Sequence, residues 1–403
     1  MTQINFKEYE TRKIVNVHRH VDGPWFWDKY SAHPYVGCRN GCEFCYARGG
    51  QYLGRRDPDT FDSIIKVKLN AATRLRKELS RRPRDVIACG DWQQPAETRY
   101  RLSRQMLEVV HDLGFPLLVI ERSPLVIRDL DLLEEINRRA WVGAMFSISN
   151  LDRALKQAYE PRSPGAGRRL KAMEALARAG ILVGTALMPI FPILGDDRHH
   201  LEEVIRATKD HGGTFVVAGG LTMHGAQAAR TIEATRRLDP KAAARLSRMY
   251  GLGEPNRTQS APQRRYQARI GSTVRELCDR HGLRDRMPRY TGSGPLGTNK
   301  RIAERLFLKT YDLELEQAKE YRIWAYRKAA WIVDELSEDI SRLYDDRGED
   351  GLRELPTIGP GLAREIAQWL QEDSCRGETL PSRDDRDRIQ QHDRGTTLEL
   401  PLF

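Results

Sequence analysis

Short apolar runs recur along the first two-thirds of the chain, and helical stretches separate them. The runs cover residues 64–69, 86–89, 117–121, 142–149, 181–188 and 214–218. The helical stretches between them cover residues 71–82, 98–113, 130–138, 167–179 and 199–211. Continuous apolar strands that alternate with helices are typical of a parallel sheet buried on both faces. We therefore predict an α/β fold, an open or partial barrel with its chemistry at the carboxyl ends of the strands.

The flanking segments of this domain carry weaker patterns. Residues 1–34 predict an irregular lead-in whose aromatic side chains cover the loop that follows, so the barrel domain is expected to span 35–287. Within it, residues 219–287 are basic and partly helical. They either complete the barrel or form a lid that faces the substrate.

A second, all-helical domain is expected at 299–372, after a linker rich in glycine and serine at 288–298. Its last part contains Gly359 and Gly361 in a helix-hairpin-helix pattern. Glycine lets the backbone come close to a phosphate, and the free N–H groups at the next helix start face the anion. Such contacts read the sugar-phosphate backbone of a nucleic acid and not its bases.

The end of the chain has a different composition. Residues 373–396 are dense in Asp and Arg without an apolar period, which predicts a disordered tether. Residues 397–403 then form a short apolar peptide. A docking motif is the interpretation we favour over a tail that folds back, and its contacts would be Leu398, Leu400, Leu402 and Phe403.

Composition and charge narrow the class of protein. The 403 residues suffice for two or three domains, and 40% of them are hydrophobic, so a full core can form. A formal net charge of +10 favours a polyanionic partner, nucleic acid first. No apolar leader and no 18-residue apolar run occur, and the six cysteines do not resemble a disulfide framework. We therefore expect a cytoplasmic, nucleoid-associated protein without a membrane segment.

Three cysteines lie in a tight C-x3-C-x2-C pattern, at Cys38, Cys42 and Cys45. Thiolates are the ligands of iron–sulfur clusters and of zinc. A four-iron cluster normally takes four cysteines, so three would leave one iron open to a substrate or cofactor. The alternative is a structural zinc site with His33 or a distant cysteine as fourth ligand, but no second cysteine pair follows at zinc-ribbon distance.

The cysteine motif resembles the signature of the radical S-adenosylmethionine (SAM) enzymes. Further motifs after the strands, Cys89-Gly90-Asp91, Glu121-Arg122-Ser123 and the run from Ser123 to Asp129, are similar to the spore photoproduct lyase branch of that superfamily over about residues 10–285. This resemblance implies a partial (β/α)6 barrel, a 4Fe-4S cluster, SAM as cofactor and an external electron donor. It also implies reductive cleavage of SAM to a 5′-deoxyadenosyl radical.

The resemblance assigns roles to individual residues. Cys38, Cys42 and Cys45 would hold the cluster. The SAM contacts that it implies are Phe44, Gly90, Asp91, Arg122, Ser147 and Ser149. Cys89 would donate a hydrogen atom to the product radical, and Tyr46 would assist radical return. Phe44 stands where the lyases carry a second Tyr, so their relay is expected to be shortened. Cys89 has an equally physical alternative role as a small buried residue at a strand end.

The helical domain resembles the small N-terminal domain of X-family DNA polymerases, the DNA polymerase beta type. The likeness covers about residues 297–372 and implies binding of the DNA backbone and a 5′-phosphate through Arg322, Tyr326, Lys328, Gly359 and Gly361. Glu365 stands where the polymerase domain carries its lyase Lys, so we predict DNA binding without that activity. The terminal peptide resembles the motif that binds the bacterial sliding clamp, although Thr397 replaces the usual Gln.

Together these features predict a radical SAM enzyme that acts on DNA, most simply one that reverses a base lesion as a carbon–carbon lyase does. Two alternatives stay open. One is a radical SAM enzyme that installs a group on a normal DNA base. The other is a non-catalytic sensor of DNA structure with a structural cluster. The lesion, the oligomeric state and the fate of SAM are not encoded in any recognisable feature.

Overall fold

The computed structural model describes residues 4–21, 26–49, 53, 56–252, 262, 264–292 and 296–376, with side chains through 372. The chain divides into two compact units. The first combines Met1–Gly292 with Thr310–Ile323, and the second combines Ser293–Lys309 with Trp324–Phe403. Among the helices that the structure describes, none has the length and apolar content needed to span a bilayer.

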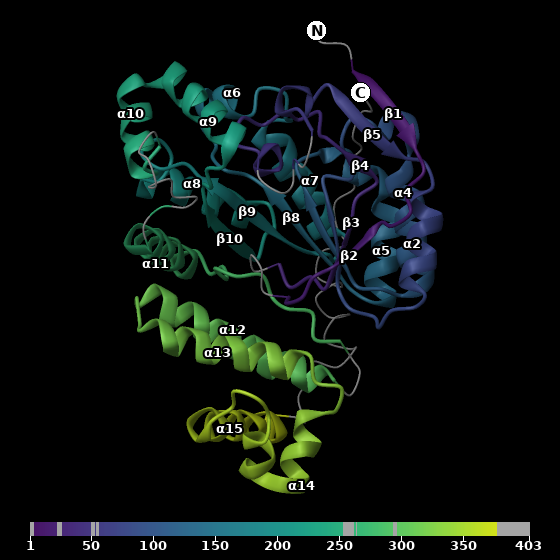
Figure 1. Ribbon diagram of the computed structural model, residues 1–403, viewed down its shortest axis with the longest axis vertical. Helices are drawn as coiled ribbons and strands as arrows, with labels where there is room; N and C mark the ends of the chain where they lie inside the picture. The colour runs from purple at the N-terminus through teal and green to yellow at the C-terminus, as the bar shows by residue number, and fades with distance from the viewer. Residues whose placement is uncertain are drawn as a thin grey trace, which may run out of the picture. The chain divides into compact units, whose positions relative to one another are not determined.

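A seven-stranded sheet forms the centre of the first unit in the described chain, with the order β10-β9-β8-β7-β6-β3-β2 (Figure 1). Its strands are β2 (Val15–Val17), β3 (Tyr30–Ala32), β6 (Ile87–Gly90), β7 (Leu117–Glu121), β8 (Val142–Ser147), β9 (Leu182–Ile190) and β10 (Phe215–Gly220). From β3 to β10 all neighbours are parallel, and only β2 is antiparallel to its neighbour in this described sheet. Six parallel strands in chain order confirm the predicted α/β partial barrel.

Helices cover one face of this sheet. They are α2 (Ala71–Leu79), α4 (Leu102–Leu113), α5 (Leu130–Arg139), α7 (Ala166–Arg178), α8 (Arg198–Asp210) and α11 (Arg264–Arg280). Because side chains alternate along a strand, Leu117 and Val119 of β7 join the core beneath the helices, whereas Leu118 lies on the opposite, inner face. The inner face is the lumen of the partial barrel.

Further helices line the carboxyl edge of the sheet and the connections beyond it. They are α3 (Glu97–Tyr100), α6 (Arg153–Tyr159), α9 (Gly225–Leu238) and α10 (Pro240–Met249), with the 3-10 turns η1 (Tyr46–Arg48), η2 (Pro58–Thr60) and η3 (Pro124–Asp129). The weakly patterned segment 219–287 thus contributes the end of β10 and helices α9, α10 and α11, while residues 253–261 and 263 lie outside the described part.

The beginning of the chain differs from the expected irregular lead-in. It contributes β1 (Asn5–Tyr9), which pairs with β5 (Ile64–Lys68) in a small sheet that also includes β4 (Tyr35–Val36). The first parallel barrel strand is therefore β3, and not the run at 64–69. In β5 the side chains of Ile65 and Val67 are buried while Lys66 is exposed, which is the pattern of a strand covered on one face.

The second unit is helical, as predicted. Four helices supply it: α12 (Gly297–Leu315) and α13 (Glu320–Asp334), each of which crosses a unit boundary, then α14 (Ile340–Arg353) and α15 (Pro360–Arg376). Helix α12 continues without a break through residues 310–312, which contain neither glycine nor proline. Helix α14 bends at Gly348, where φ is +60°. The tether and terminal peptide beyond residue 376 lie outside the described residues.

Candidate active site

The three cysteines of the motif lie on the loop that follows β3 and β4, at the carboxyl edge of the sheet. Cys42 is buried, whereas Cys38 and Cys45 are half-buried, and none of the three forms a disulfide. Burial raises the pKa of the Cys45 thiol to about 12, and the neighbouring Cys42 adds to this rise. Burial and the charges of Asp91, Cys42 and Cys45 likewise raise the pKa of Cys38. The three sulfurs therefore lie close enough to influence one another electrostatically.

Hydrogen bonds fix this loop to other elements. The Glu43 amide donates to the Tyr159 carbonyl at 2.9 Å, and Gln227 Nε2 of α9 donates to the Phe44 carbonyl at 2.9 Å. At Gly41, φ is +58°, a left-handed backbone conformation that glycine adopts without strain. Contacts with Tyr159 and Gln227 thus help to hold the loop in place.

The donor set suits a cluster better than a single ion. In the part of the chain that the structure describes, no group of three His, Cys, Asp or Glu side chains is close enough to hold one metal ion. Three thiolates on one zinc would stand roughly 3.8 Å apart, given tetrahedral bonds of about 2.3 Å. In a four-iron cluster each cysteine binds a different iron, so wider spacing is expected. His33, the proposed fourth zinc ligand, instead places Nδ1 3.3 Å from the Gly90 carbonyl oxygen.

A buried charge network lies beside the thiols. Arg122, directly after β7, faces Glu160 at 3.2 Å, and Arg169 of α7 bonds the other oxygen of the same carboxylate. Burial alone would raise the pKa of Glu160, but Arg122 and Arg169 hold it below its usual range. Asp91 faces the same two arginines, yet burial raises its pKa. The 3.2 Å contact is made by Arg122 Nη1, and it is an ion pair without the alignment of a hydrogen bond.

Some of the predicted SAM residues lie at the carboxyl end of the barrel, which we call the mouth, and others lie in the surrounding core. Gly90 ends β6 and Asp91 follows it directly. Ser147 ends β8 on the lumen face, and Arg169 Nη1 donates to its carbonyl at 2.6 Å. Ser149 donates to the Met188 carbonyl at 2.9 Å, so its hydroxyl already has a partner. Phe44 is 6% exposed and packs against the Phe191 ring, with 5.2 Å between the centroids.

Arg122 also lies over the Phe44 ring, 5.3 Å from its centroid. Phe44 therefore connects the cysteine loop to the cationic side of the site. Tyr46, in contrast, is 59% exposed in η1.

The predicted DNA contacts are distributed over two helices of the helical domain. On α13, Arg322 and Lys328 are exposed, whereas Tyr326 donates to Glu365 Oε2 on α15 at 2.6 Å. Tyr326 and Lys328 are two positions apart on α13 and therefore point in different directions. Gly359 and Gly361 both have open space where a Cβ would lie. The left-handed residue of the hairpin is Thr357, with φ of +66°, two positions before Gly359.

Comparison with known proteins finds matches for both parts of the chain. An uncharacterized protein of Mycobacterium tuberculosis (strain H37Rv), Rv2578c, is 30% identical over 232 residues, which cover 56% of this chain and 68% of the relative. The chain belongs to the same family. A second relative, the uncharacterized protein MJ0683 of Methanocaldococcus jannaschii, is 28% identical over 182 residues, covering 45% of this chain and 66% of the relative.

Solved structures establish the fold of the family's barrel. A spore photoproduct lyase complexed with dinucleoside spore photoproduct superposes with a TM-score of 0.51 at 15% identity, covering 70% of this chain and 81% of that chain. The predicted resemblance to this branch is thereby confirmed at the level of the fold. Residues 297–375 match the model of a helix-hairpin-helix domain, which confirms the second predicted domain type.

Cys89 lies on the helix-covered face of the barrel sheet. It is 3% exposed, and its register partners Ala32 and Val119 belong to the same core beneath the outer helices. Burial and the nearby Glu121 raise the pKa of this thiol. The hydrogen-donor role stays a prediction, and this position favours packing over direct contact with a ligand in the lumen.

Replacing Cys89 by Ala tests the two roles. We expect a loss of about 1 kcal/mol in the free energy of unfolding, as for a small core truncation, and an unchanged product. A thiol exchanges its proton with solvent, so the measurement is the deuterium content of the product formed in D2O. Cys278→Ala, another buried cysteine, is the control. Deuterium that disappears in the Cys89 variant alone would restore the donor role.

The lower lumen holds a second polar group. His18 Nε2 lies 3.0 Å from Ser31 Oγ, and His18 Nδ1 lies 3.3 Å from the buried Asp28 carboxyl. Burial lowers the pKa of His18 and raises the pKa of Asp28 to about 7, with Asp85 adding to the rise. At neutral pH this pair is therefore no full salt bridge.

The raised pKa of Asp28 predicts a pH-dependent stability. Between its ordinary value of 3.8 and about 7 the native state binds more protons than the unfolded state, so stability falls as pH rises through this range. Asp28→Asn removes this loss. We expect the variant to be more stable than the native protein at pH 8. At pH 5 this advantage should be smaller by a few kcal/mol, since one pKa unit corresponds to about 1.4 kcal/mol.

Urea unfolding at both pH values measures the difference. Asp210→Asn, an exposed carboxyl at the end of α8, is the control. A stability difference between the Asp28 variant and the native protein that is equal at pH 5 and pH 8 would contradict the prediction.

Sequence reasoning missed two polar side chains of the mouth, Arg169 and Asn150. Arg169 is 2% exposed on the face of α7 that also buries Met173 and Leu176. A charged residue at an apolar helix position is the signal that could have identified it. Asn150, two residues beyond Ile148 of the core, is buried with an Oδ1 that has no partner in the described chain. No sequence signal distinguishes it from a turn residue.

Proposed function

We propose that this protein is a radical SAM enzyme that acts on DNA and reverses a base lesion in the manner of a lyase. The observation that supports it most directly is the meeting of three thiols with the Arg122–Glu160–Arg169 network at the mouth of a spore photoproduct lyase fold. Thiolates are the ligands of iron–sulfur clusters, and a fixed cation beside them can bind the carboxylate of a cofactor.

Different residues at the mouth would bind different parts of the cofactors. Cys38, Cys42 and Cys45 would hold a 4Fe-4S cluster, and the Arg122 guanidinium, which also pairs with Glu160, would hold the carboxylate of SAM. Asp91 would accept the amino group, because an ammonium offsets the burial that raises the pKa of this carboxyl. When bound and reduced, the cluster and SAM supply a 5′-deoxyadenosyl radical. Arg169 keeps Glu160 charged, so that Arg122 stays oriented toward the ligand.

Support for DNA as the substrate comes from the second domain and from the charge. The helix-hairpin-helix domain at 297–375 is suited to the sugar-phosphate backbone, and the chain carries a net charge of +10. The lyase structure described above holds a dinucleoside photoproduct. We include a 5′-phosphate contact and docking of the terminal peptide on the sliding clamp in this proposal.

One anaerobic reaction tests the proposal. Reconstituted protein is incubated with dithionite, SAM and UV-irradiated DNA, and 5′-deoxyadenosine and the photoproducts are quantified together. We expect 5′-deoxyadenosine to form while one class of lesion falls and the normal base is restored. Formation of 5′-deoxyadenosine with every lesion unchanged would contradict repair. Its complete absence would contradict catalysis and favour a structural cluster.

A second candidate, installation of a group on a normal base, is favoured by the position of Cys89. An enzyme that keeps the added group needs no thiol in the lumen to return hydrogen to the product, and Cys89 lies on the other face of the sheet. Undamaged DNA incubated with SAM, followed by nucleoside mass spectrometry, separates the two functions, because a new nucleoside arises only in the second.

A further inference from the structure

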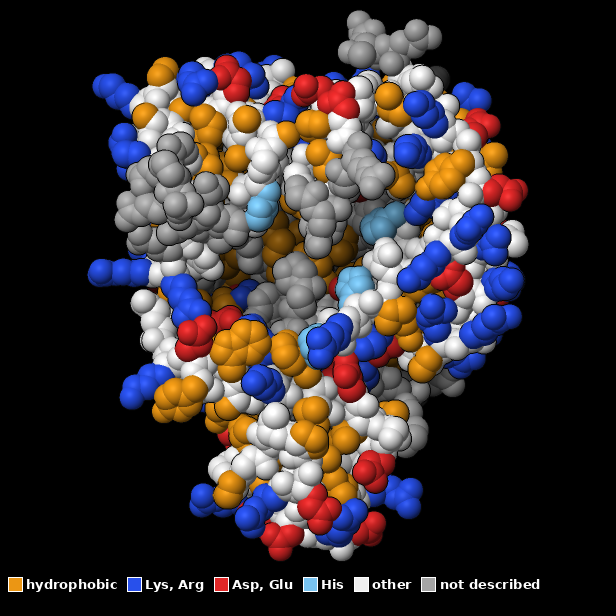
Figure 2. Space-filling model, in the orientation of Figure 1, with side chains coloured by type: hydrophobic (Ala, Val, Ile, Leu, Met, Phe, Trp, Pro, Cys, Tyr) orange, Lys and Arg blue, Asp and Glu red, His pale blue; other side chains and the backbone are white. Residues whose placement is uncertain are grey.

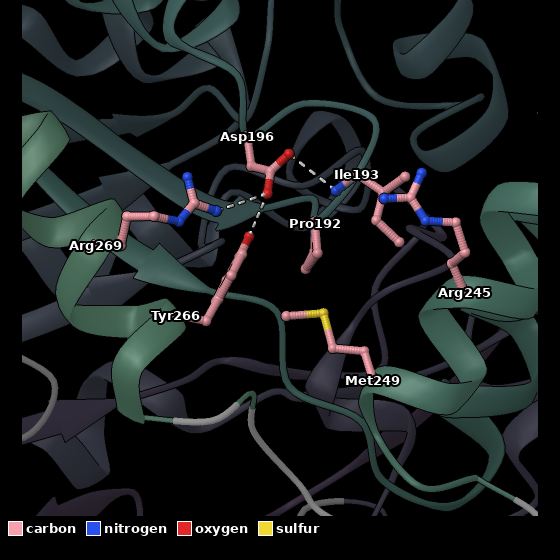
Figure 3. A pocket seen from close by; sticks show the side chains of 7 residues that line it. All are labelled: Pro192, Ile193, Asp196, Arg245, Met249, Tyr266 and Arg269. Atoms are coloured by element: carbon pink, nitrogen blue, oxygen red, sulfur yellow. Dashed lines mark hydrogen bonds and ion pairs between the residues drawn. The ribbon is translucent and has the colours of Figure 1, made fainter.

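A cavity of about 470 Å³ lies beyond the carboxyl end of β9, next to helices α10 and α11 (Figure 3). Its wall consists of Pro192, Ile193, Asp196, Arg245, Met249, Tyr266 and Arg269. Figure 3 shows the two arginines on opposite sides, with Pro192 and Met249 between them. No role has been assigned above to any of these residues.

The Asp196 carboxylate in the cavity already accepts hydrogen bonds from other groups of the protein. Asp196 Oδ1 accepts the Ile193 amide at 2.9 Å, and Oδ2 accepts the Tyr266 hydroxyl at 2.8 Å. Arg269 lies 3.7 Å from the same Oδ2. Burial and Asp196 raise the pKa of Tyr266, so the phenol keeps its proton and remains a donor to this carboxylate. Asp196 thus positions two side chains and is largely compensated.

The arginines of the cavity carry more positive charge than Asp196 compensates. Arg245 is exposed on α10 and has no ion partner within the described chain. A neighbouring cavity of about 520 Å³ shares Tyr266 and Arg269 and adds Arg265, which is exposed and likewise has no partner among the described residues. Among the described residues, no acidic side chain lines this second cavity. The two cavities share Tyr266 and Arg269, so three arginines and one compensated carboxylate line them within the described chain.

The lining combines this charge with apolar and aromatic surface. Pro192, Ile193 and Met249 offer flat apolar contact, and the Tyr266 ring stands beside them. A site for inorganic phosphate would need no apolar wall, and a site for an apolar ligand would not gather unpaired arginines. A nucleotide unit carries both an anion and a flat base, and the Tyr266 ring offers a surface for base–aromatic stacking, which has little sequence preference.

We propose that these two cavities form a groove for single-stranded nucleic acid, with one nucleotide held in the cavity of about 470 Å³ that Pro192 and Met249 line and its phosphates on Arg245, Arg265 and Arg269. The proposal rests on the proposed function and names how that substrate is held. It also explains the position of the groove, since Phe191 precedes Pro192 and packs against Phe44 of the cysteine loop. A strand in the groove would run beside the barrel mouth.

A charge-matched pair of double variants tests the groove. Arg245→Ala/Arg265→Ala removes two arginines without a described ion partner, so the fold should be retained. Arg138→Ala/Arg178→Ala removes two exposed arginines of α5 and α7 and is the control. The probe is a fluorescein-labelled thymidine octamer, and its affinity for the full chain is measured by fluorescence anisotropy over a series of NaCl concentrations.

We expect the groove variant to bind the octamer at least about tenfold more weakly and its salt slope to fall by about 1.4, at about 0.7 for each lost phosphate contact on a single strand. The control should match the native protein. An abasic octamer should bind more weakly than the thymidine octamer, and Met249→Ala should weaken only the thymidine octamer. Equal binding by the groove and control variants overturns the groove, and equal binding of both octamers overturns the nucleotide cavity.

These measurements need neither cluster, SAM nor a lesion. An inactive preparation that still separates the two double variants keeps the groove and contradicts only the proposed reaction. An active enzyme whose variants all bind the octamer alike contradicts only the groove.

Discussion

Serine in place of any one of Cys38, Cys42 and Cys45 should reduce 5′-deoxyadenosine formation to the level of a reaction without enzyme. Serine keeps the size of the side chain but supplies a poor ligand for iron, and two thiols cannot hold a four-iron cluster with one open iron. The accompanying loss of bound iron and of the visible absorption of the cluster is measured on the same samples. The fold should persist, because the loop is held by Gln227 and Tyr159.

Cys278→Ser is the matched control for this result. Cys278 is fully buried in α11, away from the motif, and its change should leave bound iron and SAM cleavage intact. Substantial SAM cleavage by any of the three loop variants would contradict the cluster assignment. Loss of iron together with loss of the folded state would contradict the view that the loop is ordered by protein contacts.

Replacing Arg169 by Met should destabilise the barrel by about 3–5 kcal/mol, the range found when one partner of a buried ion pair is removed. Arg169 is 2% exposed, bonds the buried Glu160 and donates to the Ser147 carbonyl at 2.6 Å. Its loss leaves a buried carboxylate with only Arg122 and a buried carbonyl without its donor. The measurement is the free energy of unfolding in urea, with the affinity for SAM as a second readout.

Two further variants make this prediction specific. Arg168→Met changes the exposed neighbour and should stay within about 0.5 kcal/mol of the native protein. Glu160→Gln/Arg169→Met removes the unpaired charge as well and should recover part of the loss. An Arg169 variant that is no less stable than the Arg168 variant would show that the network contributes little to the fold.

The parallel strands were predictable where their sequences are continuously apolar, as in β7, β8 and β9. Strand β3 was not, because a strand of three residues, Tyr30–Ala32, is too short to show a period. The run that replaced it in the prediction, at 64–69, contains Lys66 and Lys68, and this alternation indicates a strand with one open face.

In the candidate site, too, some residues were predictable from the sequence and others were not. Arg122 and Asp91 were predictable because they stand directly after strands, where a parallel sheet gathers side chains at one edge. Arg169 lies 22 residues beyond Ser147, the residue whose carbonyl it binds, and only the packing of α7 brings it there. The face on which Cys89 lies depends on strand register, which the motif around it does not encode.

The anchoring of the cysteine loop has a thermodynamic consequence. Small zinc domains order their ligand loops only when metal arrives, so part of the binding free energy is consumed by conformational entropy. Here Gly37, Arg39, Glu43 and Phe44 already share hydrogen bonds with Gln94, Tyr159 and Gln227. The ordering entropy of the loop is lost when the barrel folds. A cluster bound as proposed would therefore add little to the order of the loop, as a ligand adds little to the order of a rigid receptor.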